Sequence, residues 1–183
     1  YNALIGETEL ASVVQKTEFE NLYIAPSNRD LIGAEVELVQ VFSRETKLKH
    51  ALSSVQNEYD YCIIDCPPSL NLLTVNALTA ADEIIIPVQT EYYALEGISE
   101  LVHTIDLVKS NLNPDLVING IILTMHDSRN NLSQQVVEEV RSYFKEKVFQ
   151  TIIPRNVKLS ESPSHGQPIY LYDPKSKGAE SYR

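Results

Sequence analysis

The chain has 183 residues, 43% of them hydrophobic and 22% charged, which is the balance of a soluble globular protein large enough to bury a core. Its formal net charge of −10 argues against a protein coated in nucleic acid, although residues 127–158 carry six cations against four anions, a local excess that a solvated helix face explains. Because no apolar run approaches the length of a membrane span and the first residues do not form a signal peptide, we expect a cytoplasmic protein that does not enter a membrane.

The spacing of apolar residues predicts helices and strands that alternate along the chain. The first half should contain, in order, a helix at 9–15, a short strand at 21–26, helices at 31–42 and 45–55, a strand at 61–64 and a helix at 72–80. The second half should contain a strand at 82–88, a helix at 94–112, a strand at 117–124, a helix capped by Ser133 that runs to Phe144, and a strand at 148–153. Gly120 suggests that a neighbouring backbone passes close by. From Val157 onward we expect an ordered loop or a wrapped arm.

This alternation favours one α/β domain over residues 1–183, with a parallel sheet and helices on both of its faces. Cys62 and Cys66 are the only cysteines, and an extended chain would separate them by roughly 13 Å, too far for a disulfide. We expect them to be buried free thiols in a reducing compartment. The four histidines are scattered and show no metal-site spacing.

Asp65 comes directly after the expected strand at 61–64 and is followed by Pro67 and Pro68, which stiffen the next loop. Ligands of open α/β sheets lie beyond the carboxyl ends of the strands, where a carboxylate can serve a nucleotide-bound Mg²⁺ as an outer ligand. Asp65 could equally cap the helix that begins near Leu72. Spacing alone leaves both interpretations open.

Four stretches of the sequence resemble one family over nearly the whole chain. They are Tyr59-Asp60-Tyr61-Cys62-Ile63-Ile64-Asp65-Cys66-Pro67-Pro68-Ser69-Leu70 with Asn76-Ala77-Leu78, then 87–97, then Ile153-Pro154-Arg155-Asn156-Val157, and Ser160-Glu161-Ser162-Pro163-Ser164-His165-Gly166. The family is that of the ParA/Soj chromosome-partitioning ATPases, of the deviant Walker A class, whose sheet is P-loop NTPase-like. Its members begin with a Lys-Gly-Gly-x-Gly-Lys-Thr phosphate loop, and nothing in residues 1–183 resembles that loop. The resemblance therefore implies that the family's first strand and phosphate loop are missing, and that the chain stops before the family's last helix.

The resemblance also implies roles for individual residues near the nucleotide. Asp65 would be the catalytic Walker B aspartate that holds Mg²⁺ through water, with Pro67 and Pro68 in switch II. The loops at Thr124-Met125 and Pro154-Arg155-Asn156 would line the adenine pocket, although the same residues could be plain strand-end turns. The segment 89–93 could be a second switch-like loop, a dimer contact, or a pair of packed tyrosines, and the sequence does not decide.

Arg129 and Lys158 match basic positions of ParA/Soj proteins that resemble contacts to DNA made without sequence preference. Isolated cations usually mean solvated surface, so the resemblance alone carries this role. It implies that the complete protein binds ATP and Mg²⁺, forms a homodimer, coats nucleoid DNA, and is released when a ParB-type partner stimulates hydrolysis. The alternatives are a MinD-like division-site regulator and a nucleotide-free binding module.

Two expectations concern residues 1–183 by themselves. Without a phosphate loop, this polypeptide should hydrolyse no ATP, because nothing else supplies the backbone donors for the phosphates. The apolar strand at 61–65 should either pair directly with the strand at 83–88 or leave an edge that recruits other chains.

Overall fold

The computed structural model describes residues 1–67 and 69–183, and its contacts divide them into two compact units. Unit 1 consists of Tyr1–Asp82 and His103–Leu116, and unit 2 consists of Glu83–Val102 and Val117–Arg183. The assignment of residues 1–183 to a single domain stays a prediction. Within the described residues, no helix is long and apolar enough to cross a membrane.

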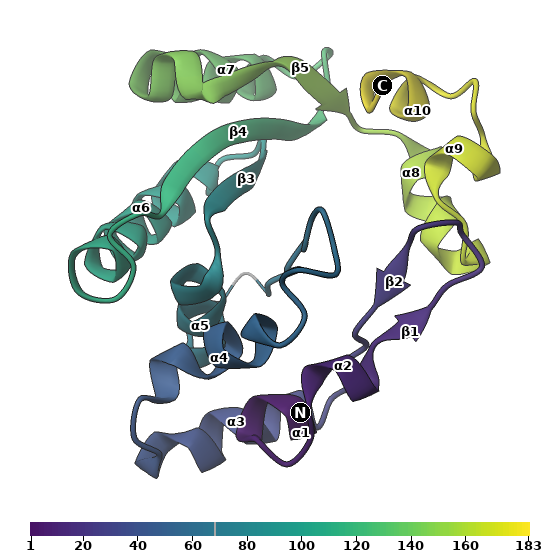
Figure 1. Ribbon diagram of the computed structural model, residues 1–183. Helices are drawn as coiled ribbons and strands as arrows, with labels where there is room; N and C mark the ends of the chain where they lie inside the picture. Colours follow the sequence, from purple (N-terminus) through teal and green to yellow (C-terminus); the bar gives the residue numbers. More distant parts are fainter. Residues whose placement is uncertain (68) are drawn as a thin grey trace. The chain divides into compact units, whose positions relative to one another are not determined.

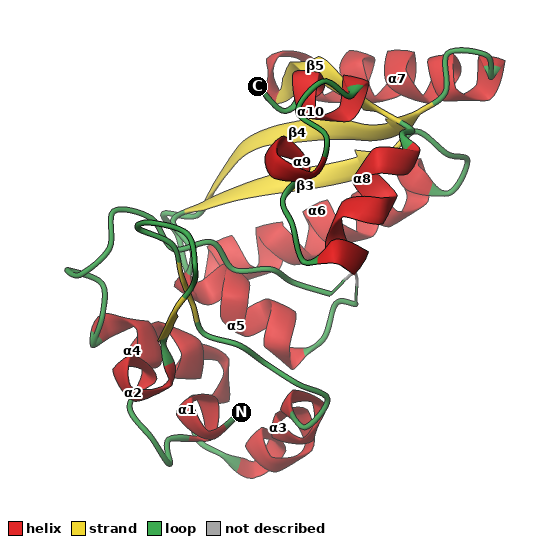
Figure 2. Ribbon diagram, turned by 90° about the vertical axis from the view of Figure 1, so that its right-hand side faces the viewer, coloured by secondary structure: helices red, strands yellow, loops and turns green. Residues whose placement is uncertain are grey.

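Unit 2 is built on a three-stranded sheet of β3 (Glu83–Gln89), β4 (Val117–His126) and β5 (Val148–Pro154), in the order β3-β4-β5 (Figure 1). Both strand pairs are parallel. Helix α7 (Asn131–Phe144) lies along one face, and the first part of α6 (Ala94–Asn111) lies on the other (Figure 2). The prediction of a parallel α/β sheet flanked by helices is confirmed.

Helix α7 begins one turn earlier than its sequence suggests. Its N-cap is Asn130, whose Oδ1 accepts the Leu132 N–H at 3.0 Å. The prediction that Ser133 caps this helix is wrong, because the Ser133 side chain is 2% exposed and donates to the Thr90 carbonyl at 2.9 Å. The apolar residues Val136, Val137 and Val140 form the buried face of the helix.

Gly120 lies in β4 where a side chain of the next strand passes close. A Cβ at this position would lie 2.5 Å from Cζ of Phe149 on β5. The close approach that the sequence predicts is therefore present, but it comes from the Phe149 ring and not from a backbone.

Beyond β5 the chain folds into short helices instead of the predicted loop or arm. These are α8 (Val157–Glu161), a 3₁₀ turn (Ser162–His165), α9 (Ile169–Tyr172) and α10 (Lys177–Ser181). Gly178 permits α10 to pack on α8, since a Cβ there would lie 2.5 Å from Cγ of Leu159.

Among its described residues, unit 1 contains one small hairpin, β1 (Gln15–Lys16) antiparallel to β2 (Tyr23–Ile24), and the second part of α6 from His103. Its other α-helices are α1 (Asn2–Ile5), α2 (Leu10–Val13), α3 (Leu31–Glu37), α4 (Lys47–Ser53) and α5 (Leu72–Ala80). Its core joins Leu4 of α1 to Ala34 and Leu38. The helix predicted at 31–42 is shorter in the structure. It tightens into a 3₁₀ turn at Leu38–Gln40, and Ser43 then adopts a left-handed conformation (φ 54°) that no helix continues through.

Helix α5 has the predicted bounds, and Asn76 joins it to the start of α4 and the turn before it. Asn76 is 1% exposed, its Nδ2 donates to the carbonyls of Arg44 (2.8 Å) and Leu72 (3.0 Å), and its Oδ1 accepts the Leu48 N–H at 3.1 Å. The buried amide therefore has partners for both its nitrogen and its oxygen.

The strand predicted at 61–64 is not formed. Residues 61–67 have no regular secondary structure, and the side chains of Tyr61 and Ile63 are 90% and 94% exposed. A strand exists only through its ladder partner, and in the described residues β3 pairs with β4 and not with 61–65. Cys62 and Cys66 are free thiols, as predicted, but both are exposed, so the prediction of their burial is wrong.

Candidate functional site

The carboxyl ends of β3, β4 and β5 meet at one edge of the sheet in unit 2. His126 is paired in register with Pro154, and the Arg155 N–H donates to the His126 carbonyl at 2.9 Å. On the other side of β4, the Thr90 N–H donates to the Thr124 carbonyl at 3.0 Å. These bonds bring two predicted groups, Thr124-Met125 and residues 154–156, onto neighbouring strand ends.

Met125 stands out in this edge by its backbone. Its φ is 56°, in the left-handed region that residues other than glycine adopt seldom, and mostly where the surroundings fix it. The ladder continues through His126 immediately afterwards, so the unusual conformation lies inside β4 and not in a free loop. Thr124 Oγ1 donates to the Val88 carbonyl over a long 3.4 Å, which leaves its oxygen able to accept a further bond.

Asn156 closes the site at the start of α8. It is the N-cap of this helix, and its Oδ1 accepts the Lys158 N–H at 2.9 Å. The oxygen is therefore used by the helix, and the amide group remains as the donor that Asn156 could offer a ligand.

A buried pair of hydroxyls joins Thr90, the residue after β3, to Ser133 in the first turn of α7. Ser133 Oγ donates to the Thr90 carbonyl at 2.9 Å, and it lies 2.7 Å from Thr90 Oγ1. Since each hydroxyl has one proton, Thr90 Oγ1 is the donor in the second bond. The Asp127 N–H also points to Ser133 Oγ, at 3.4 Å. Both hydroxyl side chains are almost fully buried, so this pair fixes the start of α7 to the end of β3.

Three ion pairs surround this edge, and each contains a cation that the sequence singles out. Arg155 Nη2 lies 2.6 Å from Glu91 Oε1, and Lys158 Nζ lies 2.9 Å from Glu161 Oε2. Arg129 binds Asp127 with two side-chain bonds, Nε to Oδ1 at 3.0 Å and Nη2 to Oδ2 at 2.8 Å. The sequence assigns no pairing role to the carboxylate partners, which are Glu91, Asp127 and Glu161.

The ion pairs change the proton affinity of their members. The Arg129 side chain and backbone N–H hold the pKa of the Asp127 carboxyl well below its usual range. The bond from Lys158, and then that from the Tyr172 hydroxyl at 2.8 Å, lower the pKa of Glu161. The same bond to Glu161 raises the pKa of Lys158, whose Nζ also lies 5.7 Å from the centre of the Tyr172 ring.

Asp65 lies in unit 1, exposed, in the irregular segment 61–67. The N-cap of α5 is Asn71, whose Oδ1 accepts the Thr74 N–H at 3.2 Å, so the interpretation of Asp65 as the cap of this helix is wrong. Pro67 is exposed next to it, whereas Pro68 lies outside the described residues. Among the described residues there is no cluster of three or more metal-binding side chains.

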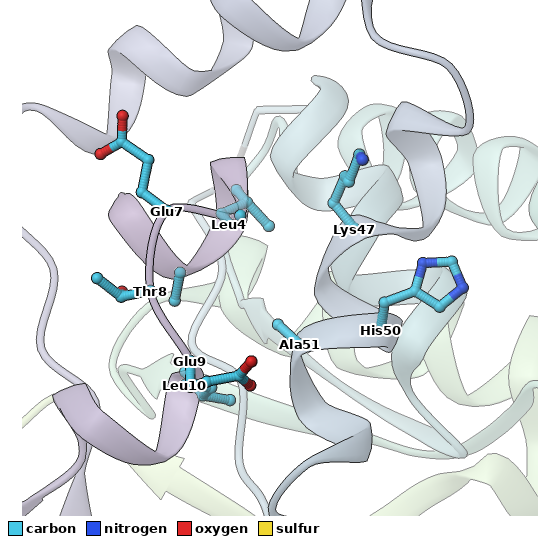
Figure 3. Close-up of a pocket in the computed structure, with 10 residues that line it drawn as sticks. Leu4, Glu7, Thr8, Glu9, Leu10, Lys47, His50 and Ala51 are labelled. Atoms are coloured by element: carbon cyan, nitrogen blue, oxygen red, sulfur yellow. The ribbon is translucent and has the colours of Figure 1, made fainter.

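The pocket shown in Figure 3, of about 360 Å³, lies elsewhere in unit 1. The segment 6–10 forms one wall and carries Glu7 and Glu9, and α4 forms the other with Lys47 and His50. Glu7 and Lys47 point away from each other in this view, and none of the residues that the sequence predicts for nucleotide or DNA lines the pocket. We therefore place the candidate site at the sheet edge and not in this depression.

Comparison with known proteins gives the family context. The model of a family described as an AAA domain matches residues 1–118. The chain is 57% identical over 182 residues to the sporulation initiation inhibitor protein Soj of Bacillus subtilis, and 60% identical over 182 residues to the chromosome partitioning protein ParA of Myxococcus xanthus. The whole chain takes part in both matches, and it spans 72% of the Soj protein and 64% of the ParA protein.

A solved structure agrees over almost the same length. A cobyrinic acid a,c-diamide synthase from Mycobacterium smegmatis, crystallised with ADP and magnesium, has a TM-score of 0.82 and 36% sequence identity. The match covers 99% of this chain and 66% of that one.

Proposed function

This chain belongs to the family of Soj and ParA chromosome-partitioning ATPases, and from that premise we propose that the full-length protein is an ATP-dependent DNA-partitioning protein. In this proposal it binds ATP and Mg²⁺, forms a homodimer in the ATP-bound state, and binds cytoplasmic nucleoid DNA without sequence preference. A ParB-type partner stimulates hydrolysis and so releases the DNA. The observation that carries the proposal is the junction of β4 and β5, where the Arg155-to-His126 bond brings residues 154–156 next to the strand end that holds Thr124 and Met125.

Asp65 is proposed as the carboxylate that holds Mg²⁺ through water. Mg²⁺ keeps several waters and typically takes one or two carboxylates together with the phosphates of its nucleotide, so a dense cluster of acidic residues is not needed. The exposed Asp65 carboxylate fits this requirement, because it caps no helix and is open to solvent. The ion would neutralise charge on the phosphates. Asp65 would orient its water shell, and Pro67 and Pro68 would limit how that loop can move.

The adenine pocket is proposed at the ends of β4 and β5. Met125 and Pro154 offer apolar surface to a base, and Thr124 and Asn156 offer an acceptor and a donor that the fold leaves available. Arg155 would lie at the border of this pocket, where its ion pair with Glu91 holds the side chain. The strained backbone of Met125 fits the same purpose, since such conformations persist mainly where the surroundings and a function require them.

The DNA contacts are proposed at Arg129 and Lys158, which follow the neighbouring strands β4 and β5. A dimer would present each of them twice, and every phosphate contact would release condensed counterions. The Arg129→Ala and Lys158→Ala substitutions should each weaken binding about equally on any DNA sequence. They should also flatten the salt dependence by roughly one unit of log–log slope per lost contact in each bound subunit.

The nucleotide part of the proposal is tested with Asp65→Asn, and Asp60→Asn serves as its matched control in the same exposed segment. Binding of a fluorescent ATP analogue and ATP turnover are measured for the full-length protein with and without Mg²⁺. Asp65→Asn should lose the Mg²⁺ dependence and at least about tenfold of the turnover, whereas Asp60→Asn should behave as the wild type. Equal behaviour of the two variants would remove Asp65 from the mechanism.

Binding of the ATP analogue, sedimentation with lipid vesicles and affinity for DNA together distinguish the proposed function from its alternatives. A nucleotide-free binding module would bind no ATP analogue in any variant. A MinD-like regulator would bind ATP and then sediment with anionic lipid vesicles instead of DNA. Arg155→Ala should weaken nucleotide affinity before it affects DNA affinity, because Arg155 lies beside the proposed adenine pocket.

A further inference from the structure

Both cations proposed to contact DNA are already paired with carboxylates close to them in the sequence. Arg129 is held by Asp127, two residues before it, and Lys158 by Glu161, three residues after it. Neither pair is buried, since the Arg129 side chain is 86% exposed and Lys158 is about half exposed. A DNA phosphate can therefore reach both cations, but the positive charge of each is already neutralised by its carboxylate partner.

The geometry of each pair shows how the carboxylate imitates a phosphate. A guanidinium has five N–H donors, and Asp127 takes Nε and Nη2, the same two-pronged arrangement that Arg uses with phosphate oxygens. Asp127 also accepts the backbone N–H of Arg129 at 3.0 Å, so the carboxylate is anchored in its own loop. Glu161 is anchored by a side chain instead, since it accepts the Tyr172 hydroxyl at 2.8 Å, a bond that does not involve Lys158.

Each of the three ion pairs at this edge of the sheet is neutral as a whole. In these pairs, the cations of Arg129, Arg155 and Lys158 lie 2.6–2.9 Å from the carboxylates of Asp127, Glu91 and Glu161. A polyanion therefore meets no net positive charge at these pairs. DNA gains charge–charge energy there only by displacing a carboxylate from its cation.

We propose that Asp127 and Glu161 act as intramolecular phosphate mimics that compete with DNA for Arg129 and Lys158, and that these two carboxylates set an upper limit on DNA affinity. The inference rests on the proposed DNA contacts and adds the residues that regulate them. Removing either carboxylate charge frees a cation. Breaking an exposed ion pair typically costs about 1.5- to fivefold in an equilibrium constant, and a dimer bound to one duplex breaks each pair twice, so the expected gain is roughly two- to 25-fold for each substitution.

The salt dependence gives a second signature with the opposite sign from loss of a contact. When a phosphate displaces Asp127, the freed carboxylate gathers cations from solution and offsets part of the counterion release from DNA. The Asp127→Asn substitution removes this offset, so its log–log slope against salt should be steeper than that of the wild type. The Arg129→Ala substitution should make the slope flatter.

A different role for Asp127 predicts the reverse result. If the carboxylate served to position Arg129 for DNA, Asp127→Asn would weaken binding, because the guanidinium would lose its orientation. The sign of the change in affinity therefore separates competition from positioning.

The experiment measures binding of a fluorescein-labelled duplex of random sequence by anisotropy, over a salt series, with Mg²⁺ and saturating ATP and the full-length protein. The variants are Asp127→Asn, Glu161→Gln and Arg129→Ala. Glu138→Gln is the matched control, since Glu138 is exposed on α7 of the same unit and bonds Gln134 at 3.0 Å. Circular dichroism and affinity for an ATP analogue confirm that each variant is folded.

The expected result is tighter binding and a steeper slope for Asp127→Asn and Glu161→Gln, weaker binding for Arg129→Ala, and little change for Glu138→Gln. Weaker or unchanged binding in the first two, with Arg129→Ala also weaker, would overturn this inference and leave the DNA contacts standing. An equal gain in Glu138→Gln would also overturn it, because general charge would then explain the effect. Arg129→Ala without effect would overturn the proposed DNA contact itself, and this inference with it.

Discussion

The buried hydroxyl pair of Thr90 and Ser133 makes a quantitative prediction. The Ser133→Ala substitution removes the donor to the Thr90 carbonyl and the acceptor of the Thr90 hydroxyl, which leaves two buried polar groups without these partners. Each such group costs about 1–3 kcal/mol, so we expect a loss of about 2–6 kcal/mol in the free energy of unfolding. The Thr90→Val substitution removes one bond and should cost about 1–2 kcal/mol, because Ser133 keeps its bond to the Thr90 carbonyl.

The double variant Thr90→Val/Ser133→Ala should cost less than the sum of the two single variants, by about 1 kcal/mol or more, since the hydroxyl that Ser133→Ala leaves unpaired is no longer present. Urea unfolding followed by circular dichroism measures all four proteins, and equal m-values show that the comparison is valid. Ser110→Ala is the control, because Ser110 is exposed and only bonds the Asp106 carbonyl of its own helix. Additive costs within about 0.5 kcal/mol would refute the reasoning.

Three further predictions concern packing, charge and chemistry. Gly120→Ala should cost about 1–3 kcal/mol, because its Cβ would collide with the Phe149 ring, and urea unfolding should show a smaller cost in a Phe149→Ala background; an equal cost in both would contradict the collision. Arg129→Ala should raise the pKa of the Asp127 carboxyl, measured by carbon NMR, and an unchanged midpoint would contradict the ion pair. The pKa of Asp127 is lower in the folded protein than in the unfolded chain, so this carboxylate stabilises the fold at a pH above its unfolded pKa. That stabilisation is lost as the pH falls through the folded pKa, and the Arg129→Ala variant should not show this loss. The polypeptide of residues 1–183 should hydrolyse no ATP in a phosphate-release assay, and turnover above a protein-free blank would show that the phosphate loop is dispensable.

The sequence predicts well those helices and strands whose own apolar pattern and bounding residues determine which side chains are buried. The strand at 83–89 and the helices at 72–80 and 94–111 carry their own apolar patterns, and turn or capping residues such as Asn71 bound them. The apolar run at 61–64 carries a pattern of the same quality, yet it forms no strand, because a ladder needs a partner that the run itself does not encode.

The candidate site shows the same division. The resemblance points to Arg129 and Lys158 but not to their partners Asp127 and Glu161. The spacing of three between Lys158 and Glu161 on a helix is a readable signal, whereas the spacing of two between Asp127 and Arg129 is not. The bond between Thr90 and Ser133 joins residues 43 positions apart, and no local pattern announces it. A serine just before an apolar helix instead favours the wrong interpretation, that of a helix cap.

The order in which the two units share the chain has a consequence for synthesis on the ribosome. Unit 1 is completed by residues 103–116, and there the Asn113 side chain donates to the carbonyls of Leu78 (3.0 Å) and Ala81 (2.8 Å). These bonds join the end of α5 to a segment made more than thirty residues later. The nascent chain must therefore expose the whole of β3 and the first half of α6, which belong to unit 2, before unit 1 can close. During synthesis of residues 83–102, unit 1 still lacks residues 103–116 and unit 2 still lacks residues 117–183. A pause in translation at this point would therefore leave both units incomplete.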